Sequence, residues 1–392
     1  MALVILLTLS IFFGAASLRA MPRKDRDSSP ALTADEGQDK SNLHDEAVAS
    51  QMPQDRQLPL PQTIRLSVLP ENPRPGEPIT VALWLPPHLE STTRYAAQLF
   101  QEGVALGRAF FFSLDAGPAS VPFIEAPSEI PSVATGAMEP LPPGALAVAL
   151  LAIPSTAKPG AAYIRVAPSL PDMPQLIIAS EEPPTAGFPP DAFPLIIQER
   201  QFLSEVLQLD PVNTDIRTVP DPQKTAESNQ LWAILNRSNT EIYALEAFIP
   251  PTAATRRTSF YGSRRVYQYS TGLRDTTIHA GVDYGIPRGS PVTASAPGRV
   301  ILARFRIVTG NTIILEHLPG VYSLYYHLDS IAIAESSMVH AGDFLGESGS
   351  TGLATGPHLH WEIRIAGENA DPDALITQPL LDKTAIISKI IQ

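Results

Sequence analysis

Residues 349–364 read GSTGLATGPHLHWEIR, a run of spaced glycines followed by a pair of histidines. The glycines are typical of tight turns, and the apolar and aromatic residues after them favour a β-strand. On an extended backbone His358 and His360, two residues apart, point to the same face. The stretch has no Lys-Ser/Thr pair and precedes a strand, which excludes a phosphate loop. We therefore expect paired histidines on a strand of a mainly β domain.

A second pair of candidate ligands, His279 and Asp283, lies in the motif HAGVD, and His327 lies between the two pairs in YYHL. His279 and Asp283 share one face if the backbone is extended. Imidazole and carboxylate groups suit zinc, and three such ligands leave one tetrahedral position for water. One histidine of the pair at 358 and 360 is then spare. It and His327 are candidates for proton transfer in hydrolysis, for which imidazole has a suitable pKa.

The three motifs in this order resemble the lysostaphin-type, or LytM-like, zinc metallopeptidases, a family of peptidoglycan endopeptidases with the duplicated hybrid motif fold. The resemblance rests on HAGVD, YYHL and GSTGLATGPHLHWE and covers residues 258–375, under a third of the chain. It implies one Zn²⁺ bound by His279, Asp283 and His360, with His327 and His358 as the catalytic pair. Two departures are Trp361, where the family usually has Phe, and a longer stretch at 267–277.

The resemblance implies an exported enzyme that hydrolyses peptide bonds in peptidoglycan, in stem-peptide cross-links or in bridges. Two alternatives stay open. A catalytically silent LytM-like regulator would activate a cell-wall amidase instead, although all five site positions are intact in this sequence. A zinc peptidase of the same kind would process exported proteins. Zinc content and the fate of purified peptidoglycan distinguish these three functions.

The remaining candidate residues are His317, His340, His44, Glu362 and Tyr261. We expect a structural role for His317 and a solvent-facing position for His340, while His44 falls in a spacer. Glu362 shares strand parity with His358 and His360, so it either orients a histidine or has a structural role. Tyr261 either lines the substrate groove or packs in the interior.

The N-terminal residues 1–20 contain an apolar run, ALVILLTLSIFFGAA, followed by small residues. This composition predicts a secretory signal peptide or, if it is uncleaved, an anchor that tethers the chain to the membrane. No cysteine follows it, which excludes a lipoprotein. Residues 21–62 are polar and rich in proline, and we expect a disordered spacer. The chain is therefore expected to be exported, to the periplasm or cell envelope.

Between the spacer and the motifs, residues 63–182 show short apolar runs separated by proline and glycine, which predict an immunoglobulin-like β-sandwich. Such a module would serve as a spacer or would bind an envelope protein or a glycan. Residues 183–251 are expected to be a linker with helices. One helix is predicted over 195–209, with Ile196, Leu203, Val206 and Leu207 on one face, and another begins at Asp221-Pro222. The antiparallel β catalytic domain is expected at 252–380, before a C-terminal tail at 381–392.

Composition separates the chain into two parts near residue 251. Of 40 prolines, 33 precede residue 252, and six of the eight histidines follow residue 278. The net charge of −12 arises entirely in residues 1–251, which argues against a nucleic-acid binder. The hydrophobic content of 44% excludes wholesale disorder. The absence of cysteine excludes a disulfide scaffold, a thiolate zinc site and a cysteine nucleophile.

Overall fold

The computed structural model describes residues 65–85, 94–114, 144–169, 192–237 and 239–391. The expected signal peptide or anchor and the spacer lie outside these residues, as do His44 and His88. Among the described residues, helices are all too short or too polar to cross a bilayer.

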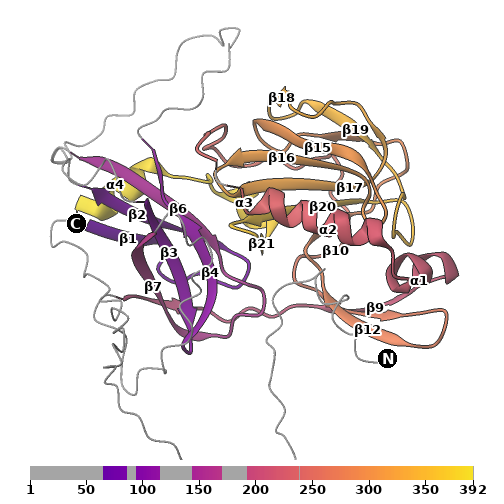
Figure 1. Ribbon diagram of the computed structural model, residues 1–392, viewed down its shortest axis with the longest axis horizontal. Helices are drawn as coiled ribbons and strands as arrows, with labels where there is room; N and C mark the ends of the chain where they lie inside the picture. The colour runs from indigo at the N-terminus through magenta and orange to yellow at the C-terminus, as the bar shows by residue number, and fades with distance from the viewer. Residues whose placement is uncertain (1–64, 86–93, 115–143, 170–191, 238, 392) are drawn as a thin grey trace, which may run out of the picture.

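Two four-stranded antiparallel sheets form the N-terminal half of the described chain, drawn in indigo and purple in Figure 1. The inner sheet has the order β1–β2–β6–β5 and the outer sheet the order β4–β3–β7–β8. Among the short apolar runs of residues 63–182, those at 64–69, 79–85, 146–153 and 163–167 each form one strand, whereas the run at 109–114 is divided between two strands. The bounds are β1 Arg65–Leu69, β2 Pro78–Leu85, β3 Arg94–Gln101, β4 Val104–Phe110, β5 Phe112–Ser113, β6 Ala145–Ala152, β7 Gly160–Ser169 and β8 Phe193–Ile197.

The inner sheet is buried on both of its faces. In β2, Val81 and Leu83 pack in the core shared with the outer sheet, whereas Ala82 and Trp84 pack in the core of the C-terminal domain. Strand β6 alternates in the same way, with Ala149 facing one core and Val148 the other. Continuous apolar runs such as ITVALWL are therefore explained by burial of both faces.

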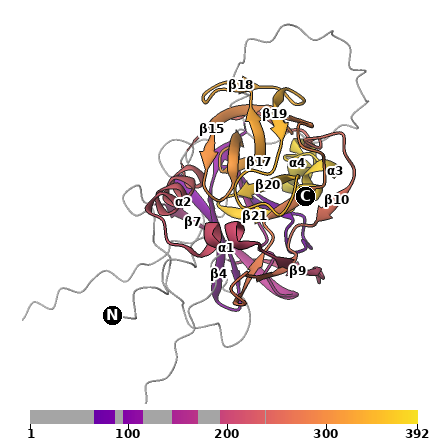
Figure 2. The same ribbon diagram turned by 90° about the vertical axis from the view of Figure 1, so that its right-hand side faces the viewer.

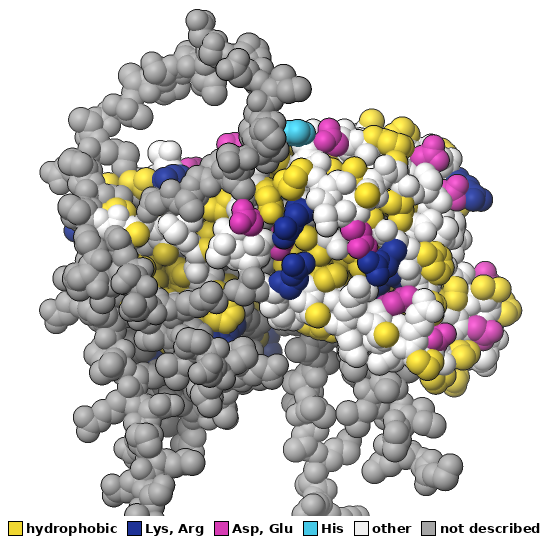
Figure 3. Space-filling model, turned by 45° about the horizontal axis from the view of Figure 1, so that its top comes forward, with side chains coloured by type: hydrophobic (Ala, Val, Ile, Leu, Met, Phe, Trp, Pro, Cys, Tyr) yellow, Lys and Arg dark blue, Asp and Glu magenta, His cyan; other side chains and the backbone are white. Residues whose placement is uncertain are grey.

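The C-terminal domain is built on a ten-stranded sheet with the main order β10–β13–β20–β17–β16–β15–β18. Strands β14 and β19 pair with each other, β19 also pairs with β17, and β21 pairs with β20. Basic and acidic side chains are interspersed on the face of this domain seen in Figure 3. The bounds are β10 Arg257–Ser259, β13 Gly281–Tyr284, β14 Pro291–Thr293, β15 Gly298–Arg306, β16 Gly310–Leu318, β17 Val321–Ile331, β18 Met338–Val339, β19 Phe344–Ser348, β20 Leu359–Ile365, β21 Glu368–Ala370 and α3 Pro372–Thr377.

A small subdomain lies against this sheet near β17 and β20 (Figures 1 and 2). It contains a three-stranded sheet, in which β9 pairs in parallel with β11, and two helices. The helix expected from Asp221-Pro222 is confirmed, because the Asp221 side chain accepts from Gln223 N and Pro222 is the first helical residue. The bounds are β9 Ser204–Gln208, β11 Arg264–Gln268, β12 Arg274–Ile278, α1 Pro211–Thr218 and α2 Pro222–Leu235.

The helix predicted over 195–209 is wrong, since this segment forms β8 and β9, which belong to two different sheets. Ile196 is 46% exposed between the buried Leu195 and Ile197, a period of two. Leu203 and Val206, expected on a buried helix face, are 62% and 60% exposed. Pairing with the outer sheet and with β11 overrides the weak helical pattern.

The segment 381–392 contains helix α4 (Lys383–Ile391), which returns to the inner sheet beside β1 and β2 (Figure 1). Ile386 and Ile390 are buried there, and Arg65 donates to the carbonyl oxygen of Ile390. Asp371 also joins the two halves: its backbone N–H donates to Gly76 O, and its carboxylate pairs with Arg200 at 2.5 Å. Helix α4 and Asp371 therefore connect the C-terminal domain to the two N-terminal sheets.

Candidate metal centre

Three neighbouring strands carry the centre of the site. Asp283 on β13 lies opposite His360 on β20, and Tyr326 on β17 lies opposite His360 from the other side. The ring of Tyr326 stacks on His360 with centroids 5.1 Å apart. Gly281 allows β13 to approach β20 closely, because a Cβ atom there would lie 2.2 Å from the carbonyl oxygen of Trp361. The strand register thus fixes Asp283 beside His360.

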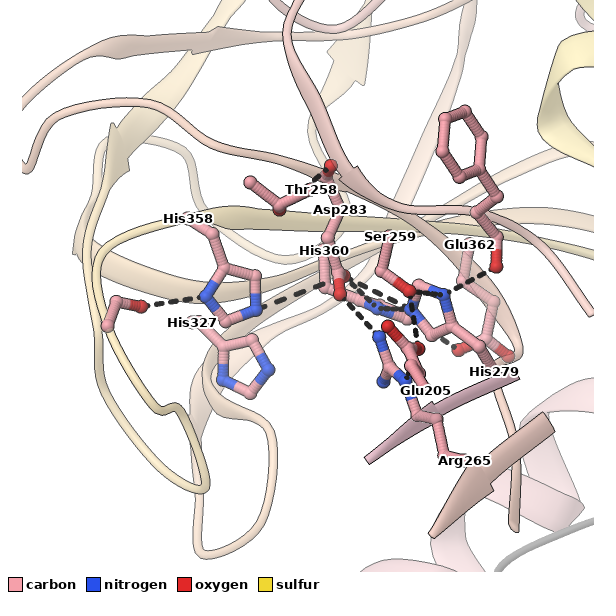
Figure 4. Close-up of polar contacts among 12 residues, drawn as sticks. Glu205, Thr258, Ser259, Arg265, His279, Asp283, His327, His358, His360 and Glu362 are labelled. Carbon is pink, nitrogen blue, oxygen red and sulfur yellow. Dashed lines mark hydrogen bonds and ion pairs between the residues drawn. The ribbon is translucent and has the colours of Figure 1, made fainter. Parts of the chain in front are cut away.

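His279, Asp283 and His360 converge on one point (Figure 4). His279 Nε2 lies 3.1 Å from Asp283 Oδ1 and 3.0 Å from His360 Nδ1, and His360 Nδ1 lies 2.9 Å from Asp283 Oδ1. All three side chains are buried. Ligands bonded at about 2.0 Å in a tetrahedron lie about 3.3 Å apart, so this spacing is close to that of a zinc site.

The hydrogen-bond partners of the outer nitrogens determine which nitrogen of His279 and of His360 carries the proton. His279 Nδ1 donates to the carbonyl oxygen of Phe260 at 2.9 Å, and His360 Nε2 faces the Glu362 carboxylate at 3.4 Å. Because both acceptors require a proton on the outer nitrogen, the inner nitrogens present lone pairs. Two lone pairs and the Asp283 carboxylate then face one another without a hydrogen between them. The donor set therefore fits a divalent metal.

A second group of side chains holds the Asp283 carboxylate. Arg265 donates to Asp283 Oδ2 at 2.6 Å and to Glu205 Oε1 at 2.5 Å. Ser259 also donates to Glu205 Oε1, at 2.7 Å. The guanidinium of Arg265, bonded to Oδ2, favours the ionised form of this buried carboxyl. Asp283 thus stays ionised and presents Oδ1 to the centre.

His327 and His358 lie together on the opposite side of the centre from Arg265 (Figure 4). Their ring centroids are 4.7 Å apart, and His358 Nε2 lies 3.9 Å from Asp283 Oδ1. His327 Nδ1 donates to Thr351 O and His358 Nδ1 to Gly356 O, both at 2.8 Å. In both rings Nε2 therefore carries a free lone pair. The structure thus brings all five residues together.

A backbone irregularity puts His327 beside Tyr326 instead of on the opposite face. Asn311 pairs with Leu328 and Ile313 with Tyr325, so one residue of β16 faces two residues of β17. His327 itself has φ of +61°, the left-handed conformation that non-glycine residues rarely adopt. Burial, followed by the nearby His358 and His360, lowers the pKa of His327 to about 3. His327 is therefore neutral at neutral pH.

Comparison with known families identifies this domain. Residues 277–372 match the model of peptidase family M23. The C-terminal domain belongs to peptidase family M23. The three candidate metal ligands, together with His327 and His358, lie inside the matched residues.

Two curated relatives each match about a third of this chain. The chain is 40% identical over 124 residues to DD-carboxypeptidase/endopeptidase Mpg of Neisseria meningitidis, covering 32% of this chain and 28% of Mpg. It is 32% identical over 118 residues to peptidoglycan DD-endopeptidase ShyA of Vibrio cholerae, covering 30% of this chain and 27% of ShyA. The chain thus spans less than a third of the length of these curated relatives.

Among solved structures, the chain is similar to the antimicrobial peptidase lysostaphin from Staphylococcus simulans. The identity is 28%, the TM-score is 0.27, and the match covers 32% of this chain and 52% of lysostaphin. A zinc containing peptidase from Vibrio cholerae is 32% identical with a TM-score of 0.31, over 33% of this chain and 40% of that chain.

The M23 site opens into a cavity of about 320 Å³. The three candidate metal ligands, His327 and the loop at 353–358 line this cavity. The small subdomain also lines the cavity, with Leu207 of β9, Arg217 of α1 and Leu231 of α2. The segment expected as a linker with helices therefore forms part of the cavity wall.

The remaining candidates now have defined contacts. His317 is buried between Pro297 O and Ser323 Oγ, which gives it a structural position, and His340 is exposed beside Asp343. Glu362 is buried against His360 and also pairs with Arg364. Tyr261 packs on Phe202 outside the residues that line the cavity.

Sequence reasoning did not find Arg265, Glu205 or Tyr326. The motif SFYGSRR contains Arg265 on a strand, and YYHL contains Tyr326 next to His327. These two motifs are the sequence features from which Arg265 and Tyr326 could have been found. Glu205 carries none, because its contact with Arg265 depends on the parallel pairing of β9 with β11.

Proposed function

We propose that this chain is a zinc metalloendopeptidase that hydrolyses peptide bonds in bacterial peptidoglycan, in stem-peptide cross-links or bridges. The observation that carries the proposal is the convergence of three buried lone-pair donors beside two histidines with free Nε2 atoms. The names of the relatives ShyA and Mpg, which describe peptidoglycan and DD-peptide hydrolysis, support this substrate.

His279, Asp283 and His360 would hold one Zn²⁺, because two imidazole nitrogens and a carboxylate oxygen suit zinc better than calcium or magnesium. When bound, zinc supplies a Lewis acid that acidifies water and polarises the scissile carbonyl. Arg265 keeps Asp283 Oδ2 occupied, which leaves Oδ1 as the ligand atom. Glu362 holds the His360 ring in the required orientation.

His358 and His327 are the proposed catalytic residues. Each fixes its own Nδ1 proton on a backbone carbonyl, so each presents Nε2 to the cavity. A lone pair at Nε2 accepts a proton from the attacking water, and the resulting N–H returns it to the leaving amine. The protonated ring also stabilises negative charge that develops on the carbonyl oxygen.

The rest of the chain has a supporting role in this proposal. The chain is exported to the periplasm or cell envelope, and residues 1–20 are removed or tether it to the membrane. The two N-terminal sheets form an immunoglobulin-like sandwich that positions the peptidase. Because the second face of the inner sheet is buried, an envelope partner would bind the outer sheet. The sandwich predicted at 63–182 also takes β8 from the segment 183–251, and the catalytic domain is proposed at 252–380.

Digestion of purified peptidoglycan sacculi tests the function directly. We expect the zinc-loaded chain to release soluble muropeptides whose masses identify the cut bond, and His360→Ala to release none. Intact sacculi together with cleaved envelope proteins would favour the protein-processing alternative. A protein without stoichiometric zinc, whose His360→Ala variant fully complements a deletion strain, would favour the silent regulator.

A further inference from the structure

Arg306 is a buried cation in the wall of the cavity. It ends β15, is 2% exposed, and lines the cavity together with Val308 and Thr309 of the following turn. Its Nη2 donates to the backbone carbonyl oxygen of Glu227 on α2 at 2.9 Å. Its Nε and Nη1 are buried and have no hydrogen-bond partner among the described residues. Two donor nitrogens of a permanently charged group are therefore unsatisfied.

The other arginines of the cavity differ from Arg306 in this respect. Arg217 pairs with Asp275, Arg265 with Asp283 and Glu205, and Arg364 with Glu362. For Arg306, the described part of the chain supplies no carboxylate within ion-pair distance. A buried charge without a counter-ion is destabilising, so a residue of this kind is expected where a ligand supplies the charge.

The position of Arg306 links it to the reacting groups. Thr309, in the same turn, accepts a hydrogen bond at 2.8 Å from the backbone N–H of His327. Arg306 also acts electrostatically on the phenol of Tyr326, whose ring stacks on His360. Arg306 therefore lies near the proposed catalytic residues, on the α2 side of the cavity.

We propose that Arg306 binds a free carboxylate of the peptide substrate, and that the enzyme selects peptides with a carboxylate close to the scissile bond. This inference rests on the proposed peptidase function and names the chemistry of its substrate. Guanidinium and carboxylate form the strongest ion pair available to a peptide ligand, and the interaction strengthens as water leaves the cavity. A neutral peptide of the same length would leave the Arg306 donors unsatisfied.

The test compares two forms of one substrate with the zinc-loaded full chain. The first is a cross-linked muropeptide dimer with free carboxylates, and the second is the same dimer after conversion of its carboxylates to primary amides. We expect kcat/KM to be about tenfold or more higher for the carboxylate form, mainly through a lower KM. Arg306→Gln should reduce this preference to about one, because kcat/KM falls for the carboxylate form.

Arg304→Gln is the matched control, since Arg304 lies two residues earlier on β15, is exposed and pairs with Glu335. It should keep the wild-type preference. If Arg306→Gln does not fold, Arg306→Lys replaces it and should lose several-fold of the preference, because ammonium cannot reproduce the guanidinium geometry. The inference is overturned if the wild type cleaves both dimers equally or if the replacement variant that folds keeps the full preference. An equal loss of kcat/KM on both dimers, together with a lower melting temperature, would also overturn the inference, because it would show that Arg306 stabilises the packing of α2.

A binding measurement separates this inference from the proposed function. Fluorescence anisotropy with a labelled dimer and metal-free protein detects recognition without hydrolysis. Tighter binding of the carboxylate form that depends on Arg306, without cleavage by the zinc-loaded protein, would refute the peptidase function and retain the carboxylate site. Cleavage of both dimers with equal affinity would retain the function and refute the carboxylate site.

Discussion

Asp283 and His360 face each other across two antiparallel strands, with Asp283 Oδ1 2.9 Å from His360 Nδ1. These atoms are 77 residues apart in the chain, and the pairing of β13 with β20 brings them together. His279 joins them from the residues just before β13. The centre is therefore held by sheet register instead of by a flexible loop.

Removal of His360 should abolish metal binding. We expect His360→Ala to lose stoichiometric zinc, because Asp283 and His279 alone provide two protein ligands. Atomic emission of protein dialysed against zinc-free buffer measures the ratio. The matched control is His340→Ala, an exposed histidine of the same domain that should keep a full equivalent. Equal zinc in both variants would contradict the assignment of the ligands.

Arg265 should affect zinc affinity although it is not a ligand. Arg265→Gln frees Asp283 Oδ2 and loosens the carboxylate, and we expect zinc affinity to fall about 10–100-fold. Competition with a chromophoric chelator measures the dissociation constant. Arg274→Gln, an exposed arginine on β12, is the control and should leave the constant unchanged. An unaltered affinity in Arg265→Gln would limit Arg265 to the contact with Glu205.

Removal of His327 or His358 should separate catalysis from metal binding. We expect His327→Ala and His358→Ala each to keep zinc but to lower kcat about 10²–10⁴-fold, the usual contribution of a general acid or base. Release of muropeptides from sacculi gives the rate, and emission spectroscopy gives the zinc content. Loss of zinc in His358→Ala would show that His358, and not His360, completes the metal site.

His317 predicts how stability depends on pH. Burial lowers the pKa of His317 from 6.5 to about 4, with the Pro297 carbonyl opposing the shift. Between these values the unfolded chain binds a proton that the folded chain does not bind, so stability falls as the pH falls from about 6.5 to about 4. The expected loss from this residue is about 1 kcal/mol per pH unit. This loss of stability disappears as the pH rises above about 6.5.

Urea unfolding of the metal-free chain at several pH values measures this effect. His317→Gln keeps a hydrogen-bonding side chain but does not titrate, so its free energy of unfolding should depend less on pH over the same window. Parallel pH curves for the two proteins would mean that His317 is accessible to protons in the folded state.

The sequence was most informative where function and local geometry coincide. His358 and His360 share a face because strand side chains alternate, and their spacing of two residues predicts this. Strands β1, β2, β6 and β7 followed from apolar runs between turn residues, whereas β3 and β8 were not predicted. The helix starting at Asp221 followed from a capping residue before proline, which acts locally.

Features that depend on distant pairing could not be predicted. Residues 195–209 contain an ambiguous pattern, and only the outer sheet and β11 decide that they form two strands. The contact of Glu205 with Arg265 joins residues 60 apart in the chain. Arg306 carries no motif, and its lack of a partner appears only when the cavity is assembled.

The double burial of the inner sheet has a consequence for how the molecule unfolds. Trp84 on β2 and Val148 on β6 belong to the same apolar core as Trp361 of the M23 sheet, and α4 covers β1 and β2 after the peptidase domain has ended. Removal of either half would expose this shared core to water. The two halves should therefore melt in one cooperative transition, and the M23 domain is not a module that can be excised intact from this chain.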